Sequence, residues 1–422
     1  MEKICVLGLG YIGLPTAAMF ATHGSQVVGV DVNKEVIAVL NEGRIHIEEP
    51  GLKILVQAAV NSGKLTVQSA PEPSDVFIIA VPTPITERKE ADLSYVESAA
   101  KSIVGSLKPG NLVILEATSP PRTTIDLVQP ILEESGLKGG VDFLLVYSPE
   151  RVLPGKILHE LVNNSRVIGG ITSESAEAGR ELYSSFVEGE ILITDATTAE
   201  MVKLMENTYR DINIAIANEF SRLGDKFEVD VWEAIRIANH HPRVNILTPG
   251  PGVGGHCISV DPWFFVEKAP QESQLIKTAR LVNDGQPGFV VQTLQEEFTS
   301  LKGKVFAALG VTYKPNVDDL RESPAVEVIK QLQRAGAKVK AFDPFVKKES
   351  KILDFMVGDL EEALSDSDGI LLLVNHSQFD DLDPEKIFPA LKQPYILDTR
   401  NTINKGVWQK AGFRVKILGD GS

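Results

Sequence analysis

Residues 3–31 of this 422-residue chain read KICVLGLGYIGLPTAAMFATHGSQVVGVD. The apolar stretches Lys3–Leu7 and Val27–Val30 predict two short buried strands, and the residues between them up to Ala21 have the spacing of a helix. A glycine-rich turn precedes this helix, and Asp31 follows the second strand. This order of strand, turn, helix, strand and acid is the fingerprint of a dinucleotide-binding unit. The chain is therefore expected to begin with a Rossmann-like domain.

The turn has the spacing GxGxxG, and each glycine has an expected task. Gly8 is expected to make the turn, Gly10 to let the backbone approach a pyrophosphate, and Gly13 to let the helix pack closely on the strand. Asp31 would accept the ribose hydroxyls and repel a 2′-phosphate, which favours NAD over NADP. The residues predicted to bind the cofactor here are Gly8, Gly10, Tyr11, Ile12, Gly13 and Asp31.

Three further strands are predicted downstream, each followed by a turn that contains proline. They are Val76–Val81, Leu112–Glu116 and Phe143–Tyr147. Strands that alternate with helices form a parallel sheet, and ligands bind beyond the carboxyl ends of its strands. The turns are therefore expected to line the nicotinamide site, through Pro82, Thr83 and Thr118, although proline at a strand end can equally well serve only to stop the strand. Glu150 follows the last strand and is a candidate base.

Composition limits the partners and the compartment. The net charge of −15 and the pI near 5.1 argue against nucleic acid and anionic membranes, because both attract proteins rich in Lys and Arg. Glycines interrupt the apolar residues 4–20, which disfavours a signal sequence, and no run approaches the ~18 apolar residues needed to span a bilayer. The chain has two cysteines, Cys5 and Cys257, which are too few for a disulfide framework and fit a reducing compartment. A soluble cytoplasmic protein is therefore expected. Cys5 lies within a predicted strand and is expected to be a small core residue.

A long helix is predicted over residues 198–223, which contain no Gly or Pro and repeat apolar residues at helical spacing. Lys203 and Asn207 lie four residues apart and so share a face, which Asp211 continues. Such a polar stripe is usually the solvated side of a helix. Because apolar residues surround much of this helix, the alternative is a buried Lys–Asn pair, which would need a functional reason.

Residues 249–261 read PGPGVGGHCISVD. The glycines leave room for a ligand beside the backbone, and Cys257 in an open loop is placed for nucleophilic chemistry. The plain alternative is a glycine-rich turn that holds a small apolar residue. A zinc site is disfavoured, because the neighbours His256 and Cys257 cannot easily bind one ion and no paired-cysteine spacing supports them; no metal is predicted. Arg243 is expected to bind phosphate.

A second α/β unit is predicted near the C-terminal end of the sequence. Its strands are Lys304–Leu309, Lys338–Phe342, Ile370–Val374 and Tyr395–Leu397. No GxGxxG accompanies them, so a nucleotide other than a dinucleotide is the expected ligand. The fold class is α/β, with two Rossmann-like parallel-sheet domains joined by a long central helix. The expected domains are 1–196 for NAD, 197–298 for the central helix and the loop with Cys257, and 299–422 for the second nucleotide.

Several separated motifs resemble the UDP-glucose/GDP-mannose dehydrogenase family, which oxidises a primary alcohol to a carboxylate. They are GLGYIGLP at 8–15, VPTP at 81–84, SPERVLPG at 148–155, AEMVKLMENTYRDINIAIANE at 199–219, GVGGHCISVDPW at 252–263 and YKPNVDDLRESPA at 313–325. The stretches most similar to the branch that acts on UDP-N-acetylhexosamines are HIEEP at 46–50, ADLSYVESAA at 91–100, NHHPRVNILTPGPGVGGHC at 239–257 and NHSQF at 375–379. The resemblance covers nearly the whole chain.

The resemblance implies a four-electron oxidation at C6 of UDP-N-acetyl-D-mannosamine by two NAD, with UDP-N-acetyl-D-glucosamine as the alternative substrate. Cys257 would be the nucleophile that forms a thiohemiacetal and then a thioester. The other implied catalytic residues are Lys203 and Asn207 for oxyanions, Asp261 for water activation with Lys203, Glu150 as base or water-orienting group, and Thr118 for holding water. The implied substrate-binding residues are Arg151, Val152, Lys203, Asn207, Arg210, His241, Arg243, Gly254, Tyr313, Lys314 and Arg321. A homodimer through the long helix is also implied.

Two stretches depart from the family's pattern. Pro120-Pro121-Arg122 stands where a Pro-then-Gly turn is usual, and Leu153-Pro154-Gly155 replaces a second glutamate of the UDP-glucose branch. Two other classes remain as alternatives: a two-electron hydroxyacid dehydrogenase, which would share the first domain without needing Cys257, and a non-catalytic nucleotide-sugar sensor. The NADH formed per sugar distinguishes these classes.

Overall fold

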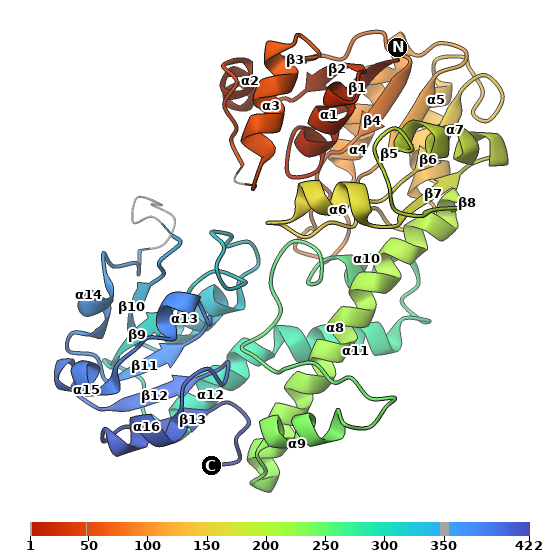
Figure 1. Cartoon of the computed structure of the whole chain (residues 1–422). Helices are drawn as coiled ribbons and strands as arrows, with labels where there is room; N and C mark the ends of the chain where they lie inside the picture. The colour runs from red at the N-terminus through yellow and green to blue at the C-terminus, as the bar shows by residue number, and fades with distance from the viewer. Residues whose placement is uncertain (1, 48, 347–353) are drawn as a thin grey trace. The chain divides into compact units, whose positions relative to one another are not determined.

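The computed structural model describes residues 2–47, 49–346 and 354–422. The chain forms two compact units, Met1–Glu206 with Trp263–Pro270 and Asn207–Pro262 with Gln271–Ser422. Each unit contains one β-sheet (Figure 1). Of the motif at residues 46–50, residue 48 lies outside the described residues. The three domain boundaries expected from the sequence stay a prediction.

The first unit contains an eight-stranded sheet in the order β3-β2-β1-β4-β5-β6-β7-β8, with only the β6–β7 pair antiparallel among the described strands. The strands are β1 (Lys3–Leu7), β2 (Gln26–Val30), β3 (Leu65–Gln68), β4 (Val76–Ile79), β5 (Leu112–Leu115), β6 (Leu144–Tyr147), β7 (Arg166–Gly170) and β8 (Ile191–Asp195). The strand order reverses at β1, between β2 and β4, which is the switch point at which Rossmann-like sheets bind ligands.

Helices of the first unit cover both faces of this sheet. They are α1 (Gly13–Thr22), α2 (Lys34–Asn41), α3 (Leu52–Asn61), α4 (Ser94–Ile103), α5 (Gln129–Glu133), α6 (Ile157–Asn163) and α7 (Ser173–Tyr183), with a 3-10 turn η1 (Val104–Ser106) and a π-helix η2 (Thr124–Val128). Side chains alternate along β1, so Ile4 and Val6 join one apolar core and Cys5 and Leu7 join the other. Burial raises the pKa of the Cys5 thiol to about 11, in agreement with its expected place in the core.

The second unit contains a five-stranded parallel sheet in the order β10-β9-β11-β12-β13. The strands are β9 (Val305–Leu309), β10 (Lys338–Phe342), β11 (Gly369–Leu372), β12 (Tyr395–Asp398) and β13 (Arg414–Ile417). The helices are α9 (Val231–Ala238), α11 (Gln274–Asp284), α12 (Gln286–Phe298), α13 (Pro324–Arg334), α14 (Leu360–Leu364), α15 (Pro384–Ile387) and α16 (Lys405–Lys410), with 3-10 turns η3 (Ser377–Phe379) and η4 (Phe388–Ala390). The two Rossmann-like sheets expected from the sequence are thus confirmed.

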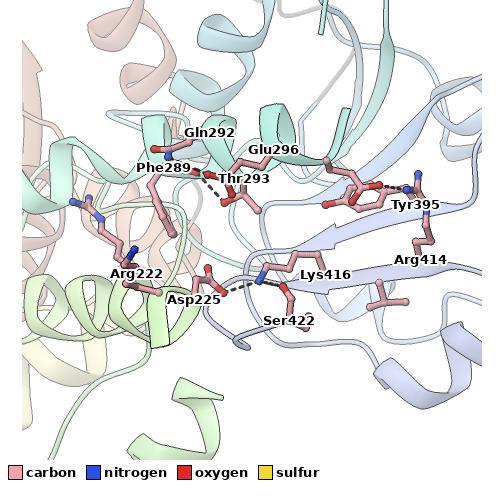
Figure 2. A pocket seen from close by; sticks show the side chains of 13 residues that line it. Arg222, Asp225, Phe289, Gln292, Thr293, Glu296, Tyr395, Arg414, Lys416 and Ser422 are labelled. Carbon is pink, nitrogen blue, oxygen red and sulfur yellow. Dashed lines mark hydrogen bonds and ion pairs between the residues drawn. The ribbon is translucent and has the colours of Figure 1, made fainter. Parts of the chain in front are cut away.

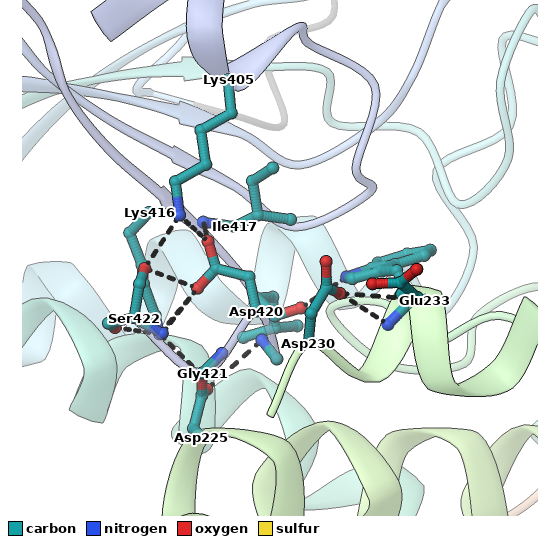
Figure 3. A network of polar contacts seen from close by, with 12 residues as sticks. Asp225, Asp230, Glu233, Lys405, Lys416, Ile417, Asp420, Gly421 and Ser422 are labelled. Atoms are coloured by element: carbon teal, nitrogen blue, oxygen red, sulfur yellow. Dashed lines mark hydrogen bonds and ion pairs between the residues drawn. The ribbon is translucent and has the colours of Figure 1, made fainter. Parts of the chain in front are cut away.

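Helix α8 (Ala196–Phe227) confirms the expected long helix and extends beyond the predicted residues 198–223 at both ends. Helix α8 and helix α10 (Asp261–Lys268) both contain residues of the two units. Within the second unit, Asp225 of α8 binds strand β13 and the segment that follows it. Its carboxylate lies 2.6 Å from Lys416 Nζ of β13 and accepts the backbone N–H of Gly419 and Gly421 (Figure 3). In the part of the chain that the structure describes, no helix combines the length and apolar character needed to cross a membrane.

Candidate active site

The turn after β1 has the geometry of a dinucleotide site. Gly8 has φ +89°, and a Cβ on Gly13 would lie 1.8 Å from the carbonyl oxygen of Gly8, so only glycine fits either position. A Cβ on Gly10 would meet nothing within 4 Å, which leaves room beside the backbone for a pyrophosphate. Helix α1 begins at Gly13 without a side-chain cap at Ile12, and its first turn holds no acid. The turn therefore fits NAD, and the N–H groups at the start of α1 would bind its phosphates.

Asp31 lies at the carboxyl end of β2, beside this turn. Its Oδ2 accepts the backbone N–H of Leu9 at 3.0 Å, and its Oδ1 accepts that of Asn33 at 2.8 Å. These bonds fix the half-buried carboxylate next to the glycine-rich turn. His46 lies close to Asp31: burial lowers the pKa of this imidazole, although the Asp31 carboxylate opposes the shift. Tyr11 and Ile12 are both half-buried at the start of α1.

The turns after β4 and β5 contact each other. The Oγ1 of buried Thr83 donates a hydrogen bond of 2.6 Å to the carbonyl oxygen of Thr118, whereas Pro82 is exposed. The structure thus brings together two of the three residues predicted to line the nicotinamide site. Both turns follow strands next to the switch point of the sheet, as expected for a ligand site.

Glu200 of α8 anchors the turn that departs from the family's pattern. Its buried carboxylate accepts the backbone N–H of Arg122 at 2.5 Å, the N–H of Thr124 at 2.8 Å and the Thr124 hydroxyl at 2.6 Å. Arg122 has φ +74°, a conformation that favours glycine, and its guanidinium is paired with Asp126. The backbone thus retains a glycine-like turn although the sequence has arginine. Burial raises the pKa of the Glu200 carboxyl to about 7.

Glu150 is held by two donors in the first unit. Its Oε1 accepts the backbone N–H of Arg151 at 2.7 Å, and its Oε2 is bound by the guanidinium of Arg166. Arg166 is 4% exposed and also contacts Glu116, with 3.4 Å between Arg166 Nη1 and Glu116 Oε1. Tyr183 donates its hydroxyl to the same Glu116 oxygen at 2.5 Å. One buried guanidinium is therefore shared between two carboxylates.

Because one cation cannot neutralise both acids, we expect Glu116 to lower the stability of the protein at alkaline pH. Burial raises the pKa of Glu116 from 4.5 to about 7, although Arg166 opposes the shift. Between these pH values the folded state holds a proton that the unfolded state has lost, so stability falls as pH rises towards 7 and stays low above it. This loss amounts to ~3 kcal/mol. Glu116→Gln, which mimics the protonated acid, is expected to remove the part of the pH dependence that comes from Glu116, whereas buried Glu200, whose pKa is also raised to about 7, keeps its own contribution.

The measurement is denaturant unfolding at about pH 5 and pH 8. Glu174→Gln, which removes an exposed carboxylate of α7, is the matched control and should keep the wild-type dependence. An unchanged pH dependence in Glu116→Gln would contradict this interpretation.

The loop after β6 is tied to distant residues. The Arg151 guanidinium is bound by Glu206, at 3.0 Å from Nε, and donates to the carbonyl oxygen of Ser165 at 2.8 Å. The carboxylate of Glu49 accepts the backbone N–H of Gly155 and of Ile157, both at 2.8 Å. Glu49 thus links the motif at residues 46–50 to the motif at 148–155, a role that sequence reasoning missed. Val152 is half-buried and packs against the core of the first unit.

In the second unit, Cys257 lies in a tight turn that leads into α10. Its carbonyl oxygen accepts the N–H of Val260 at 3.1 Å and of Asp261 at 2.8 Å, and its side chain is exposed. Neighbouring His256 is half-buried: burial lowers the pKa of its imidazole, and Arg321 adds to this effect.

The two glycines before His256 pack against the loop after β9. A Cβ on Gly254 would lie 2.5 Å from the carbonyl oxygen of Glu322, and one on Gly255, which has φ +84°, would lie 2.8 Å from the ring of Tyr313. The N–H of Gly255 donates to the carbonyl oxygen of Arg321 at 3.0 Å. The structure therefore places three predicted substrate residues, Gly254, Tyr313 and Arg321, next to the turn that carries Cys257.

The polar stripe of α8 is buried. Lys203 and Asn207 are each 8% exposed and Asp211 is fully buried, so this stripe is not the solvated side of the helix. Asn207 Nδ2 donates to Asp261 Oδ2 at 2.6 Å, which joins two predicted catalytic residues of the second unit. Asp211 is bound by Arg280 Nη1 at 2.5 Å, and burial raises the pKa of this carboxyl although Arg280 opposes the shift.

Other predicted substrate residues lie on the surface. Arg210 is exposed on α8. His241 and Arg243 are exposed in a loop closed by Asn239 and Ile246, which exchange two hydrogen bonds. Within this loop the N–H of Arg243 donates to His241 Nδ1 at 3.3 Å. Lys314 is half-buried. Arg321, which lies further along the same loop, is exposed and forms an ion pair with Asp319 at 2.6 Å.

A pocket of about 570 Å³ lies elsewhere in the second unit, between α8, α12 and β13 (Figure 2). None of the predicted site residues lines it. Two ion pairs lie in its lining, Lys416 with Asp225 and Arg414 with Glu297. Over residues 2–47, 49–346 and 354–422, no three His, Cys, Asp or Glu side chains cluster in a way that could hold a metal ion.

Comparison with known proteins identifies relatives over the whole length. Three domains of the UDP-glucose/GDP-mannose dehydrogenase family match in order: the NAD binding domain at residues 2–187, the central domain at 197–285 and the UDP binding domain at 307–405. The chain is 50% identical to the UDP-N-acetyl-D-mannosamine dehydrogenase of Methanococcus maripaludis, over 100% of this chain and 98% of that protein.

Solved structures of similar proteins have the same fold over nearly the full length of this chain. The UDP-D-ManNAc dehydrogenase of Pyrococcus horikoshii has a TM-score of 0.93 at 42% identity, with 99% of each chain covered. The UDP-N-acetyl-mannosamine dehydrogenase of Staphylococcus aureus has a TM-score of 0.90 at 46% identity, again with 99% of each chain covered.

Proposed function

We propose that this chain, a member of the UDP-glucose/GDP-mannose dehydrogenase family, oxidises UDP-N-acetyl-D-mannosamine to UDP-N-acetyl-D-mannosaminuronate. Membership of this family makes it an NAD-dependent dehydrogenase. The observation that carries this proposal is 50% identity, over the full chain, to a relative with that substrate in its name. The alternative substrate is UDP-N-acetyl-D-glucosamine, which differs only in configuration at C2 of the sugar.

The covalent chemistry is proposed for Cys257, whose side chain is exposed in its turn. NAD, when bound, accepts a hydride from C6 in each of the two oxidations. Between them the Cys257 thiolate adds to the C6 aldehyde, which forms a C–S bond and a thiohemiacetal instead of releasing the aldehyde. Loss of the second hydride leaves a thioester on Cys257. Attack by water then breaks the C–S bond, gives the carboxylate and returns the thiolate.

The polar residues are proposed to stabilise charge and direct water. Lys203 and Asn207 would stabilise the negative charge that develops on the C6 oxygen, and Asp261, held by Asn207, would act on the attacking water. Glu150 is proposed to orient water rather than to act as a base, because both of its oxygens already accept hydrogen bonds, one of them from a buried arginine. Thr118 would hold the same water from the turn after β5.

Substrate identity is tested with a panel of UDP-sugars. The specificity constant kcat/KM for UDP-N-acetyl-D-mannosamine should exceed those for UDP-N-acetyl-D-glucosamine and UDP-glucose by at least about tenfold, the effect of ~1.4 kcal/mol in the transition state. A higher kcat/KM for the glucosamine epimer would reverse the assignment. Tight binding of these sugars without NADH formation would support the sensor class instead.

Asp31→Asn is expected to weaken the preference for NAD over NADP. The amide oxygen can still accept the N–H of Leu9, the N–H of Asn33 loses its carboxylate partner, and the charge that repels a 2′-phosphate is removed. The ratio of kcat/KM for NAD to that for NADP should fall by roughly tenfold. Glu174→Gln, which removes an exposed carboxylate of the same unit, should leave the ratio unchanged. An unaltered ratio in Asp31→Asn would show that Asp31 does not select the cofactor.

We further propose that two copies of the chain pair through α8. Apolar side chains form an exposed stripe at helical spacing on this helix: Tyr209, Ile216, Phe220, Leu223 and Phe227. An apolar groove of about 310 Å³ continues this stripe towards α9. A stripe on one helix can pair with the same stripe on a second copy about a twofold axis.

Phe227→Glu should therefore shift the protein towards monomer in sedimentation equilibrium, whereas Ile54→Glu, on similarly exposed apolar surface of α3, should not. A monomeric wild-type protein would contradict the proposal.

A further inference from the structure

Two buried titratable side chains of the second unit have no role in the chemistry proposed above. Asp343 follows β10 and is 3% exposed, and His376 lies between β11 and η3 and is fully buried. His376 Nε2 lies 2.9 Å from Asp343 Oδ2. His376 belongs to the stretch at residues 375–379 that resembles the N-acetylhexosamine branch.

The hydrogen bonds determine the form of the imidazole. His376 Nδ1 accepts the backbone N–H of Asn316 at 2.9 Å, so this nitrogen carries no proton. Nε2 therefore carries the proton and donates it to Asp343, and the ring is neutral. Phe345 stacks on the ring with centroids 5.0 Å apart, and Phe379 meets it edge-on at 5.5 Å. One neutral side chain thus links the acid after β10 to the loop after β9.

Asp343 accepts four hydrogen bonds, three of them at Oδ2. Its Oδ2 also accepts the N–H of Val311 at 2.7 Å and of Thr312 at 3.2 Å, and its Oδ1 accepts that of Phe345 at 2.9 Å. Burial acts to raise the pKa of this carboxyl, but the bonds from His376 and Val311 outweigh burial and lower it. In the first unit the corresponding acid, Asp31, is expected to face ribose hydroxyls. Asp343 is 3% exposed and already accepts four hydrogen bonds from the protein, so we expect a nucleotide in the second unit to be recognised mainly by the loop.

We propose that His376 is a positioning residue, which holds the loop Thr312–Asn316 in the conformation that binds the uridine diphosphate part of the substrate. The proposal rests on the proposed function, in which Tyr313 and Lys314 of this loop bind the nucleotide-sugar. His376 itself does not touch the ligand and acts through the backbone of Asn316 and the carboxylate of Asp343.

The contacts of Asn316 show how the loop is held at its far end. Asn316 has φ +60°, and its Oδ1 accepts both the N–H of Ser377 at 3.0 Å and the Ser377 hydroxyl at 3.1 Å. Together with the bond from Asn316 N–H to His376, these form a reciprocal link between the two segments. Thr312 closes the near end, since its hydroxyl donates to the carbonyl oxygen of Lys314 at 3.0 Å.

The held loop also supports the turn that carries Cys257. The Tyr313 ring lies against Gly255, where a Cβ would come within 2.8 Å of it. The N–H of Tyr313 donates to the carbonyl oxygen of Asp319 at 3.0 Å, which shapes the segment leading to Arg321. Loss of His376 is therefore expected to misplace Tyr313 and Lys314 without removing any group that contacts the ligand.

The probe is uridine diphosphate itself, titrated calorimetrically into the full chain. His376→Ala should raise the dissociation constant of UDP and the KM for the UDP-sugar by roughly 10-fold to 100-fold, because the N–H of Asn316 and the Asp343 carboxylate each lose a partner. The dissociation constant of NAD should stay within about twofold. His376→Gln, which offers one donor and one acceptor, should recover most of the affinity.

Two further variants separate positioning from loss of folding. Asn316→Gly keeps the positive φ at an exposed position, so it should fold normally and still weaken UDP binding. Ile396→Ala makes a cavity in the same sheet and should lower the melting temperature while UDP affinity is retained. Wild-type UDP affinity in folded His376→Ala or in Asn316→Gly would overturn the inference. A wild-type protein that fails to bind UDP at all would instead refute the proposed function.

Discussion

Cys257→Ser is expected to lower kcat by at least about 10⁴-fold, because an enzyme that loses its covalent nucleophile keeps only binding and charge stabilisation. Serine has the size of cysteine, but its alkoxide forms far less readily than a thiolate near neutral pH. The dissociation constant of NAD should remain within about twofold, since the predicted NAD residues lie in the first unit and Cys257 in the second. Steady-state kinetics and NAD titration check both expectations.

The matched control is Cys5→Ala, at the only other cysteine of the chain. Cys5 is fully buried in the core and burial raises the pKa of its thiol, so it should neither carry catalysis nor react with alkylating agents. Iodoacetamide is therefore expected to inactivate wild type and Cys5→Ala alike. A Cys257→Ser enzyme with wild-type kcat, or full activity after alkylation, would exclude the covalent role.

Lys203→Met should lower kcat by about 10²-fold to 10³-fold, the usual effect of removing one donor to a developing oxyanion. Methionine fills similar space and suits the buried position, so the loss should reflect charge rather than packing. Lys203→Arg keeps the charge and should retain more activity than Lys203→Met. The KM for the UDP-sugar should change less than kcat, because the interaction strengthens as charge develops.

Lys226→Met is the matched control for this prediction. Lys226 belongs to the same helix but is exposed near its end, so its replacement should leave kcat unchanged. Equal activity of Lys203→Met and wild type would show that another group stabilises the oxyanion. A rise in KM at constant kcat would show that Lys203 binds the substrate and the transition state equally, and does not act on the developing charge.

Much of the fold followed from local patterns. The strands at Lys3–Leu7 and Lys338–Phe342 have the predicted bounds. The first is a short apolar run bounded by turn residues, and in the second the buried Val339 and Ala341 alternate with more exposed residues. Strand β8 escaped notice because its position at the sheet edge leaves most of its residues partly or fully exposed. Strand β7 ends in two glycines, which weaken any strand signal.

The site was predictable where chemistry follows from the spacing of residues in the sequence. The spacing of Gly8, Gly10 and Gly13 determines a local geometry, which the structure contains. The supporting acids were not predictable in the same way. Glu49 binds backbone 106 residues away, and Glu200 binds a turn 76 residues away. Nothing in a single sequence distinguishes such buried carboxylates from the solvated ones that most glutamates are.

His376 illustrates the same limit. The stretch around it resembles the family, but a lone histidine after an apolar strand has no spacing that predicts a role. Its importance depends on partners 33 and 60 residues away in the sequence, Asp343 and Asn316, which only the fold brings together.

The most direct test of the account is the number of NADH formed for each UDP-N-acetyl-D-mannosamine consumed by the wild-type enzyme. If Cys257 retains the sugar between the two oxidations, the ratio is two, the product is the uronate, and a carbonyl trap such as hydroxylamine finds no aldehyde in solution. A ratio of one, or trapped aldehyde, would contradict the covalent mechanism.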